Sequence, residues 1–279
     1  MTMLSINTNI GAMTSSQSSY SVNRSMEASM ERLSSGKRIN SGADDAAGLF
    51  ISKRMTGEIQ GLNQAVRNAA DAQAYLETTE GAMEEIHTIL LRMRELAVQG
   101  SNGTYTTQDI RAIRTEIVDL QTEIDRIADD TTFNNLGVLS GAASTGITFQ
   151  IGADNTQTMT VSIANASTTA LGLTAMSTAG TNVTTAAAMM AYISTIDAAI
   201  STVSSNRGTL AAAVNRLDHA IANMQNVATN LSMAKGRVED ADFAAETSNL
   251  ARVQVLQQAS MAMLAQANAS KQNVLSLFQ

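Results

Sequence analysis

Residues 193–231, ISTIDAAISTVSSNRGTLAAAVNRLDHAIANMQNVATNL, carry the pattern that decides the fold. Alternating steps of three and four residues along this stretch meet an apolar residue at every position except Arg207: Ile193, Ile196, Ile200, Val203, Arg207, Leu210, Val214, Leu217, Ile221, Met224, Ala228 and Leu231. This spacing is typical of the seam of a coiled-coil helix. At 1.5 Å per residue the helix is about 60 Å long, so other long helices must lie beside it. The stretch predicts a mainly α-helical rod, a bundle of long antiparallel helices.

Composition excludes several other classes of protein. The 279 residues contain no Pro, Cys or Trp, and 44% are hydrophobic, which excludes a wholly disordered chain. Without Cys there are no disulfides or thiolate metal sites. A net charge of −7 argues against binding nucleic acid or an anionic membrane through a basic surface. Apolar runs are too short for membrane insertion, and residues 1–10 do not have the pattern of a cleavable signal peptide. On composition alone, the expected location is the cytoplasm.

The same periodicity predicts four further helices, at residues 5–33, 46–99, 107–130 and 243–269. In the third, Ile110, Ile117 and Ile124 share one face, and we expect them to form the rod core with seam residues Ile196, Ile200, Leu210, Leu217 and Ile221. Between residues 147 and 163 apolar residues alternate with polar ones, which predicts a small β-hairpin. Residues 167–185, rich in Thr, Ala and Gly, are expected to be an exposed linker and a plausible glycan acceptor.

These elements suggest three regions: residues 1–45, a central rod at 46–231, and a joint with a last helix at 232–279. Both ends carry apolar stripes that neither end can bury by itself: Leu4, Ile6, Ile10, Met13 and Leu33 at one end, and Leu250, Val253, Leu256, Leu264, Val274, Leu275 and Leu277 at the other. Burying one large apolar side chain contributes roughly 1.5–3 kcal/mol. We therefore predict self-assembly, with the termini at the most buried contacts.

Both ends also resemble bacterial flagellin, the subunit of the flagellar filament. The matching motifs include LSINTNI (4–10), RLSSG (32–36), DDAAGL (44–49), RMRELAVQ (92–99), RVEDAD (237–242), LAQAN (264–268) and QNVLSL (272–277). In order, the motifs cover about residues 1–140 and 185–279. Only residues 141–184 lie between them, so the chain resembles a short flagellin that lacks the large variable outer domains. Lys37, Phe50 and Lys271 depart from the family pattern.

The resemblance implies that the termini pair as an inner tube and that the central helices form an outer tube around it. It also implies an extracellular location, reached by flagellar type III export without a cleaved signal, which replaces the cytoplasmic expectation. The implied partners are other copies of the chain, an export chaperone, the filament cap and the hook-junction proteins. Arg92, Leu96 and Glu116 match the flagellin surface recognised by an innate Toll-like receptor. We interpret this patch first as a contact between subunits, with receptor binding left to the free monomer.

The sequence indicates no catalytic, cofactor or metal site. His87 and His219 have no other ligand at metal-binding spacing, and we assign them structural or solvated roles. Asp44 and Asp45, like the acidic residues of 239–242, are read as helix caps and ion-pair partners rather than cation ligands. The alternatives to a filament subunit are the related hook–filament junction protein and a cytoplasmic coiled-coil module with a signalling or enzymatic role. The module is less favoured because no sensor domain or catalytic constellation accompanies the helices.

Overall fold

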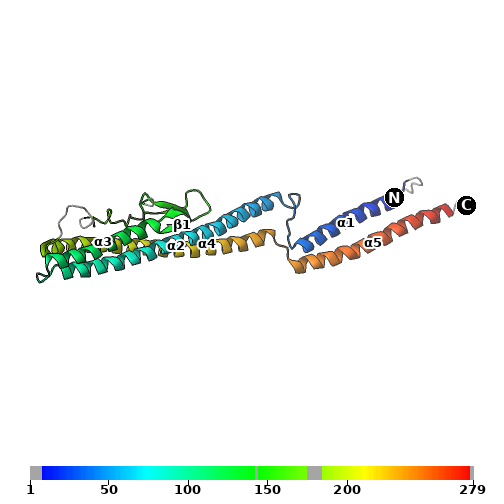
Figure 1. Ribbon diagram of the computed structural model, residues 1–279. Helices are drawn as coiled ribbons and strands as arrows, with labels where there is room; N and C mark the ends of the chain where they lie inside the picture. Colours follow the sequence, from blue (N-terminus) through cyan, green and yellow to red (C-terminus); the bar gives the residue numbers. More distant parts are fainter. Residues whose placement is uncertain (1–7, 142–143, 175–183, 277–279) are drawn as a thin grey trace. The chain divides into compact units, whose positions relative to one another are not determined.

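A computed structural model describes residues 8–141, 144–174 and 184–276 of the chain, and of residues 271–276 it describes the backbone only. The described part contains five α-helices and two antiparallel two-stranded sheets (Figure 1). Their bounds are α1 Ile10–Ser35, α2 Ala46–Gly100, α3 Thr107–Asp130, β1 Thr132–Phe133, β2 Leu136–Gly137, β3 Ile147–Gln150, β4 Thr158–Val161, α4 Ala186–Glu239 and α5 Phe243–Ser276. The prediction of a mainly α-helical fold is confirmed.

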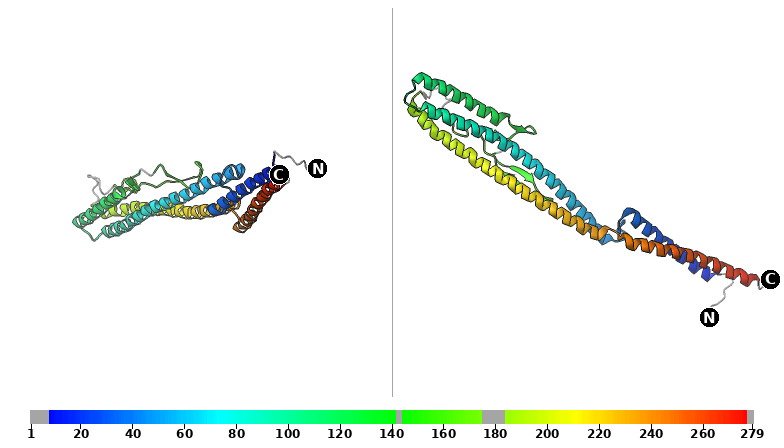
Figure 2. Two further views of the ribbon diagram at one scale, coloured as in Figure 1. Left: turned by 90° about the vertical axis from the view of Figure 1, so that its right-hand side faces the viewer. Right: turned by 90° about the horizontal axis from the view of Figure 1, so that it is seen from below.

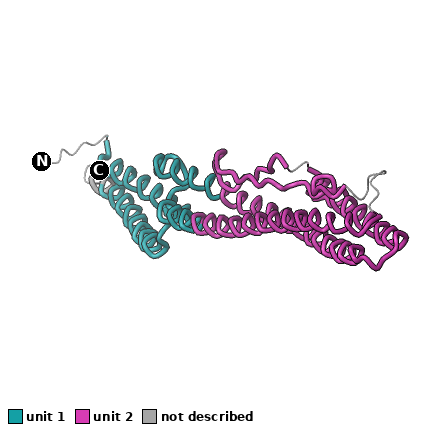
Figure 3. The backbone as a smooth tube through the Cα atoms, turned by 90° about the vertical axis from the view of Figure 1, so that its left-hand side faces the viewer, with its two compact units in different colours: residues 1–59, 229–279 teal, residues 60–228 magenta. Residues whose placement is uncertain are grey.

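The residues fall into two compact units, coloured separately in Figure 3. Unit 1 contains residues 1–59 and 229–279, and unit 2 contains residues 60–228. The divisions fall inside α2 and α4, so each of these helices contributes to both units. Unit 2 holds the three-helix core and the strands, whereas unit 1 holds the two terminal helices and the segments that join them to α2 and α4.

In unit 2, α2 and α4 run antiparallel. Polar pairs between them step forward along one helix and backward along the other: Gln73 with Asp218, Glu80 with Arg207, and Arg94 with Asp197. All twelve positions of the predicted seam are buried or half-buried, because α2 and α3 supply the opposing apolar faces. Fully buried residues on those faces include Leu76, Met83, Ile86, Leu90 and Met93 of α2, and Ile117 and Ile124 of α3.

Arg207, the polar exception in the seam, remains half-exposed and pairs with α2. Its guanidinium donates from Nε and Nη2 to Glu80 Oε1 at 2.9 and 2.6 Å, and Nη2 lies 3.6 Å from Glu84. The apolar part of a long Arg side chain can lie along the seam while its charged end stays in solvent. A single charge is therefore tolerated on an otherwise apolar stripe.

The strands include the predicted hairpin and a second one that was not predicted. In the first, β3 pairs with β4 in the register Ile147 with Val161. The second joins β1 to β2 through Asn134 and Asn135, which have φ of 50° and 65°. Positive φ at both central residues is the geometry of a tight hairpin turn, and Asn accepts it more readily than most residues do. The Asn-Asn pair after α3 was the available signal, but strands of two residues are too short to show alternation.

The expectation of an exposed linker at residues 167–185 is wrong for its first part. Thr168 donates from its amide and its hydroxyl to the Asp125 carboxylate of α3, at 2.8 and 2.7 Å. Leu171 and Leu173 are buried, and the Leu173 carbonyl accepts from Gln121. Two leucines and a paired hydroxyl thus fix residues 167–174 to the bundle, whereas residues 175–183 lie outside the described part.

The joint after the seam begins later than predicted. Helix α4 continues through Ser232 and Gly236 to Glu239, and only Asp240–Asp242 separate it from α5. Gly236 does not end the helix. A Cβ at this position would lie 2.8 Å from Asp240 Oδ2, so the glycine leaves room for that carboxylate. The Asp240 amide then donates to the Gly236 carbonyl as the last bond of the helix.

Helix α4 also satisfies a membrane-span criterion by length and composition. One 18-residue window has a mean hydropathy of 1.4, and 28% of that window is buried. A long helix in the core of a soluble bundle has the same composition. The apolar seam of α4 packs against other helices of the chain, so this seam is covered without a membrane.

Candidate assembly surface

The terminal helices α1 and α5 pack side by side in unit 1 (Figures 1 and 2). Asn9 Nδ2 donates to the Ala267 carbonyl at 3.1 Å, and Gln257 Nε2 donates to Asn23 Oδ1 at 2.8 Å. Early residues of α1 thus contact late residues of α5, so the pair is antiparallel. Gly11 faces Ala267 across the pair, and a Cβ at Gly11 would make only ordinary van der Waals contact with that of Ala267, at 3.7 Å. The start of α1 and the late residues of α5 therefore lie at the same end of the helix pair.

Much of the apolar surface of this pair is uncovered. The exposed large apolar side chains on the two helices are Ile10, Met13, Tyr20, Met30, Phe243, Val255, Leu256, Met261 and Met263. Of the predicted assembly residues, Ile10, Met13 and Leu256 are exposed, and Leu33, Leu250, Val253 and Leu264 are half-buried. Leu4, Ile6 and Leu277 lie outside the described residues, and the side chains of Val274 and Leu275 are not described. The helix pair thus covers one apolar stripe and leaves others open.

On α5 the open positions surround the helix. At about 100° per residue, the half-buried Leu250, Val253 and Leu264 share the side that faces α1. Val255 lies opposite that side, and Leu256 lies between the two. A helix that is apolar on every side is normally buried on every side. One partner helix covers only one side of α5, so the remaining sides require further neighbours.

A buried carboxylate ties the two chain segments of the joint together. Glu239, at the end of α4 and only 6% exposed, pairs with Lys37 Nζ at 2.5 Å and accepts a short hydrogen bond from Ser52 Oγ of α2. The hydrogen bond from Lys37, followed by that from Ser52, lowers the pKa of Glu239 to about 2. The same contact raises the pKa of Lys37.

Backbone bonds reinforce this contact between the segment after α1 and the segment between α4 and α5. The Arg38 amide donates to the Glu239 carbonyl at 2.7 Å, and the Ala241 amide donates to the Gly36 carbonyl at 3.0 Å. Gly36 has a φ of 69°, a left-handed conformation that glycine adopts without strain. These bonds hold the segment that carries Lys37 beside the end of α4, where Lys37 pairs with Glu239.

The acidic residues that lie near the joint serve as caps of helices and turns. Asp45 Oδ1 accepts from the Gly48 amide at the start of α2, and Asp242 Oδ1 accepts from the Ala244 amide at the start of α5. Asp44 accepts from the Ser41 amide and hydroxyl, and these bonds lower its pKa. Within the described ranges no group of three or more His, Cys, Asp or Glu side chains is arranged to hold a metal ion.

The candidate receptor patch is partly accessible. Arg92 Nη2 pairs with Glu116 Oε1 of α3 at 2.8 Å, and both side chains are about half-exposed. Leu96 is only 2% exposed, because it packs into the core of unit 2. Of the three residues, only Arg92 and Glu116 are therefore available to a partner. His87 of the same helix is half-buried, and His219 of α4 is exposed.

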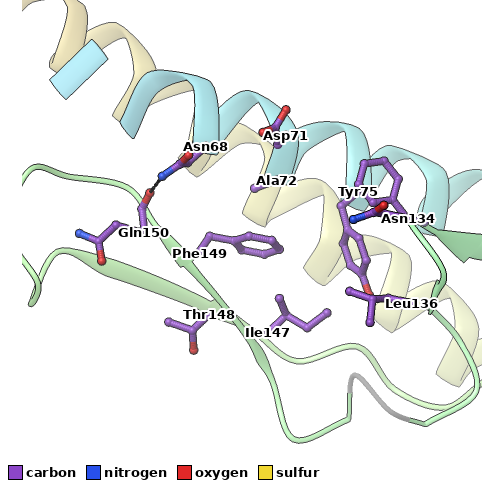
Figure 4. A pocket seen from close by; sticks show the side chains of 11 residues that line it. Asn68, Asp71, Ala72, Tyr75, Asn134, Leu136, Ile147, Thr148, Phe149 and Gln150 are labelled. Atoms are coloured by element: carbon purple, nitrogen blue, oxygen red, sulfur yellow. Dashed lines mark hydrogen bonds between the residues drawn. The ribbon is translucent and has the colours of Figure 1, made fainter. Parts of the chain in front are cut away.

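A cleft of about 310 Å³ lies between α2 and the two hairpins (Figure 4). Phe133 meets the ring of Tyr75 edge-on at 5.5 Å, and Phe149 lies 6.0 Å from the same ring. Asn68 Nδ2 donates to the Gln150 carbonyl at one end of the cleft. Burial raises the pKa of Tyr75, whose hydroxyl has no partner among the described residues. The aromatic cluster anchors both hairpins to α2.

Long helices with an aliphatic seam, and a terminal pair that stays apolar on several sides, favour a structural protein whose copies pack against one another. Two family models match this chain: the bacterial flagellin N-terminal helical region over residues 6–144, and the C-terminal helical region over residues 193–278. The chain belongs to the bacterial flagellin family. Few residues separate the matched regions, so it is a short form that lacks the large outer domain.

Individual relatives agree with this assignment. The chain is 42% identical to a flagellin of Halalkalibacterium halodurans over 277 residues, and 40% identical to a flagellin of Bacillus subtilis over 302 residues; each match covers 98% of this chain and 99% of the relative. A solved structure of a putative flagellar hook-associated protein from Vibrio parahaemolyticus matches with a TM-score of 0.59, 16% identity, and coverage of 71% of this chain and all of that one. That likeness shows the fold alone. The protein is a structural subunit of the bacterial flagellar filament, an extracellular polymer of many copies.

Proposed function

We propose that the α1–α5 pair is the element through which copies of this flagellin enter the filament. The observation that carries the proposal is the distribution of exposed apolar residues over several sides of α5, which one partner helix does not cover. Each large apolar side chain that becomes buried contributes roughly 1.5–3 kcal/mol. Contacts with several neighbouring copies bury these sides, and a polymer supplies such contacts at every position except its ends.

In this arrangement the two ends of the chain and the central region have different roles. Residues 1–45 and 232–279 form an inner layer of the filament, where the apolar sides of α5 are covered. Residues 46–231 form an outer layer and stiffen the filament that turns to propel the cell. The already buried core of unit 2 supports this division, since it leaves the terminal pair as the part that gains most from assembly.

Truncation tests the proposal. Chains that lack residues 2–32 or 247–279 should keep the helical signal of unit 2 in circular dichroism and lose polymerisation, as followed by light scattering and electron microscopy. A truncated chain that forms normal filaments would contradict the proposal.

A point variant with a matched control tests the same surface without deletion. Val255→Asp places a charge where assembly is expected to bury an apolar side chain, and should raise the critical concentration at least tenfold. Gln258→Asp adds the same charge at an exposed polar position one turn away. If both variants polymerise like the parent chain, this side of α5 has no role in assembly.

Further partners follow from family membership. We include an export chaperone, the filament cap and the hook-junction proteins, with export through the flagellar type III apparatus without cleavage. An intact mass of the exported chain that equals the sequence mass would support uncleaved export, and a shorter product would contradict it.

For the free monomer we add a host Toll-like receptor at Arg92 and Glu116. Equal receptor activation by the monomer and an Arg92→Ala variant would remove that patch.

A further inference from the structure

The methionines of this chain are sorted between the two units. Five of them are buried, Met83, Met93, Met159, Met189 and Met224, and all five belong to unit 2. Of the six described methionines that are exposed, five belong to unit 1: Met13, Met30, Met233, Met261 and Met263. Four of these, Met13, Met30, Met261 and Met263, lie on the terminal helices α1 and α5. The terminal pair thus presents thioethers on the surface that assembly covers.

The composition makes these thioethers the main targets of an oxidant. The 16 Met residues are accompanied by no Cys and no Trp, so neither a thiol nor an indole competes for it. A peroxide transfers one oxygen to the sulfur: an S–O bond forms, the O–O bond breaks, and hydrogen peroxide leaves as water. The sulfur loses two electrons and the peroxide gains them. The product, a sulfoxide, is polar, and methionine sulfoxide reductases reverse the step.

We propose that Met13, Met30, Met261 and Met263 form a reversible oxidation site that controls entry into the filament. The inference rests on the proposed assembly role of the α1–α5 pair. In the free chain each of the four side chains is more than half exposed, so a peroxide reaches all four sulfurs. A thioether is apolar, which favours its burial between copies. A sulfoxide is polar, which disfavours that burial.

Met261 adds an effect within the helix pair. Its Sδ lies 4.0 Å from Ser19 Oγ of α1, and Ser19 is the donor of that contact. A sulfoxide oxygen at Met261 is a stronger acceptor and adds volume beside a buried hydroxyl. Oxidation of Met261 therefore changes both the outer surface of the α1–α5 pair and the contact between its two helices. In the filament the four sulfurs are covered by neighbouring copies and resist the oxidant.

The first test compares free chains with assembled filaments. Dilute hydrogen peroxide should oxidise the four methionines of the free chain at least tenfold faster than Met83 and Met93, as measured by peptide mass mapping. Oxidation at the four positions should be at least tenfold slower in filaments. Oxidised chains should show a critical concentration raised fivefold or more, and methionine sulfoxide reductases should restore it. Unimpaired polymerisation of a chain fully oxidised at the four positions would overturn the proposal.

Leucine variants separate this site from other effects of peroxide. Replacing all four residues by Leu conserves volume and apolar character, so this variant should polymerise before and after peroxide. The control variant, Met190→Leu with Met233→Leu, removes two exposed thioethers outside the helix pair and should stay peroxide-sensitive. A four-Leu variant as sensitive as the parent would overturn the oxidation site, even where the truncations abolish assembly. Polymerisation of the truncated chains would instead overturn the assembly role.

Discussion

Glu239 shows how one side chain holds a joint between helices. Its carboxylate is almost fully buried, and it meets an ammonium from the segment after α1 and a hydroxyl from α2. A buried carboxylate is unfavourable unless such partners compensate for its lost hydration. Because the partners hold its pKa near 2, below the ordinary value of 4.5, its stabilising contribution is present above about pH 4.5 and is lost as the pH falls towards 2.

Glu239→Gln should therefore loosen the joint at neutral pH. Lys37 is half-exposed, which screens the pair, so we expect a loss of about 1–2 kcal/mol. Hydrogen exchange should show roughly 5- to 30-fold less protection of the Arg38 and Ala241 amides at pH 7. The difference from the parent chain should shrink between pH 4.5 and 2. Glu27→Gln, at an exposed position of α1, serves as the control, and equal protection in both variants would show that the pair does not stabilise the joint.

The helices illustrate how a periodic pattern is converted into a core. Every seam position of α4 is buried or half-buried, and apart from Arg207 the polar contacts to α2 come from the adjacent positions Asp197 and Asp218. Tyr192 and Gln121 form one of the few polar contacts in this core, and burial raises the pKa of Tyr192 to about 12. The apolar spacing therefore decides which face turns inward, and the buried hydrogen bond adds specificity where α3 meets α4.

Leu217→Ala should destabilise unit 2 by roughly 2–5 kcal/mol, because this fully buried side chain would leave a cavity in the seam. Urea unfolding of the free chain, followed by circular dichroism, measures the loss. Leu91→Ala removes the same atoms from a residue of α2 that is 44% exposed, and should change stability by about 0.5 kcal/mol or less. Equal losses in the two variants would mean that the seam is not the main source of stability.

At the scale of the whole chain, the two units use their apolar residues differently. Unit 2 covers its largest ones within the chain, and unit 1 leaves many uncovered. The hydrophobic effect near room temperature is mostly entropic, and it strengthens on warming from the cold. Assembly driven by the terminal pair should share this behaviour.

The critical concentration for polymerisation should therefore fall when the temperature rises from 5 to 30 °C. It should fall further in sulfate than in chloride of equal ionic strength, because sulfate is excluded from apolar surface and favours burial. Sedimentation of filaments from the remaining free chain measures both effects. A critical concentration that rises on warming, or that depends on ionic strength alone, would indicate assembly by ion pairs instead.

The helices, the β3–β4 hairpin and the family can all be predicted from the sequence, because three-four spacing, two-residue alternation and the terminal motifs are local patterns that can be counted along the chain. The sequence did not reveal the β1–β2 turn, the fixed position of Thr168 and Leu173, or the Lys37–Glu239 contact. Those features join residues that are distant in sequence, or depend on backbone conformation, so only the tertiary structure decides them. Burial is decided in the same way: Leu96 and Leu91 lie five residues apart on one helix, yet only the packing of α2 against its neighbours buries the first and exposes the second.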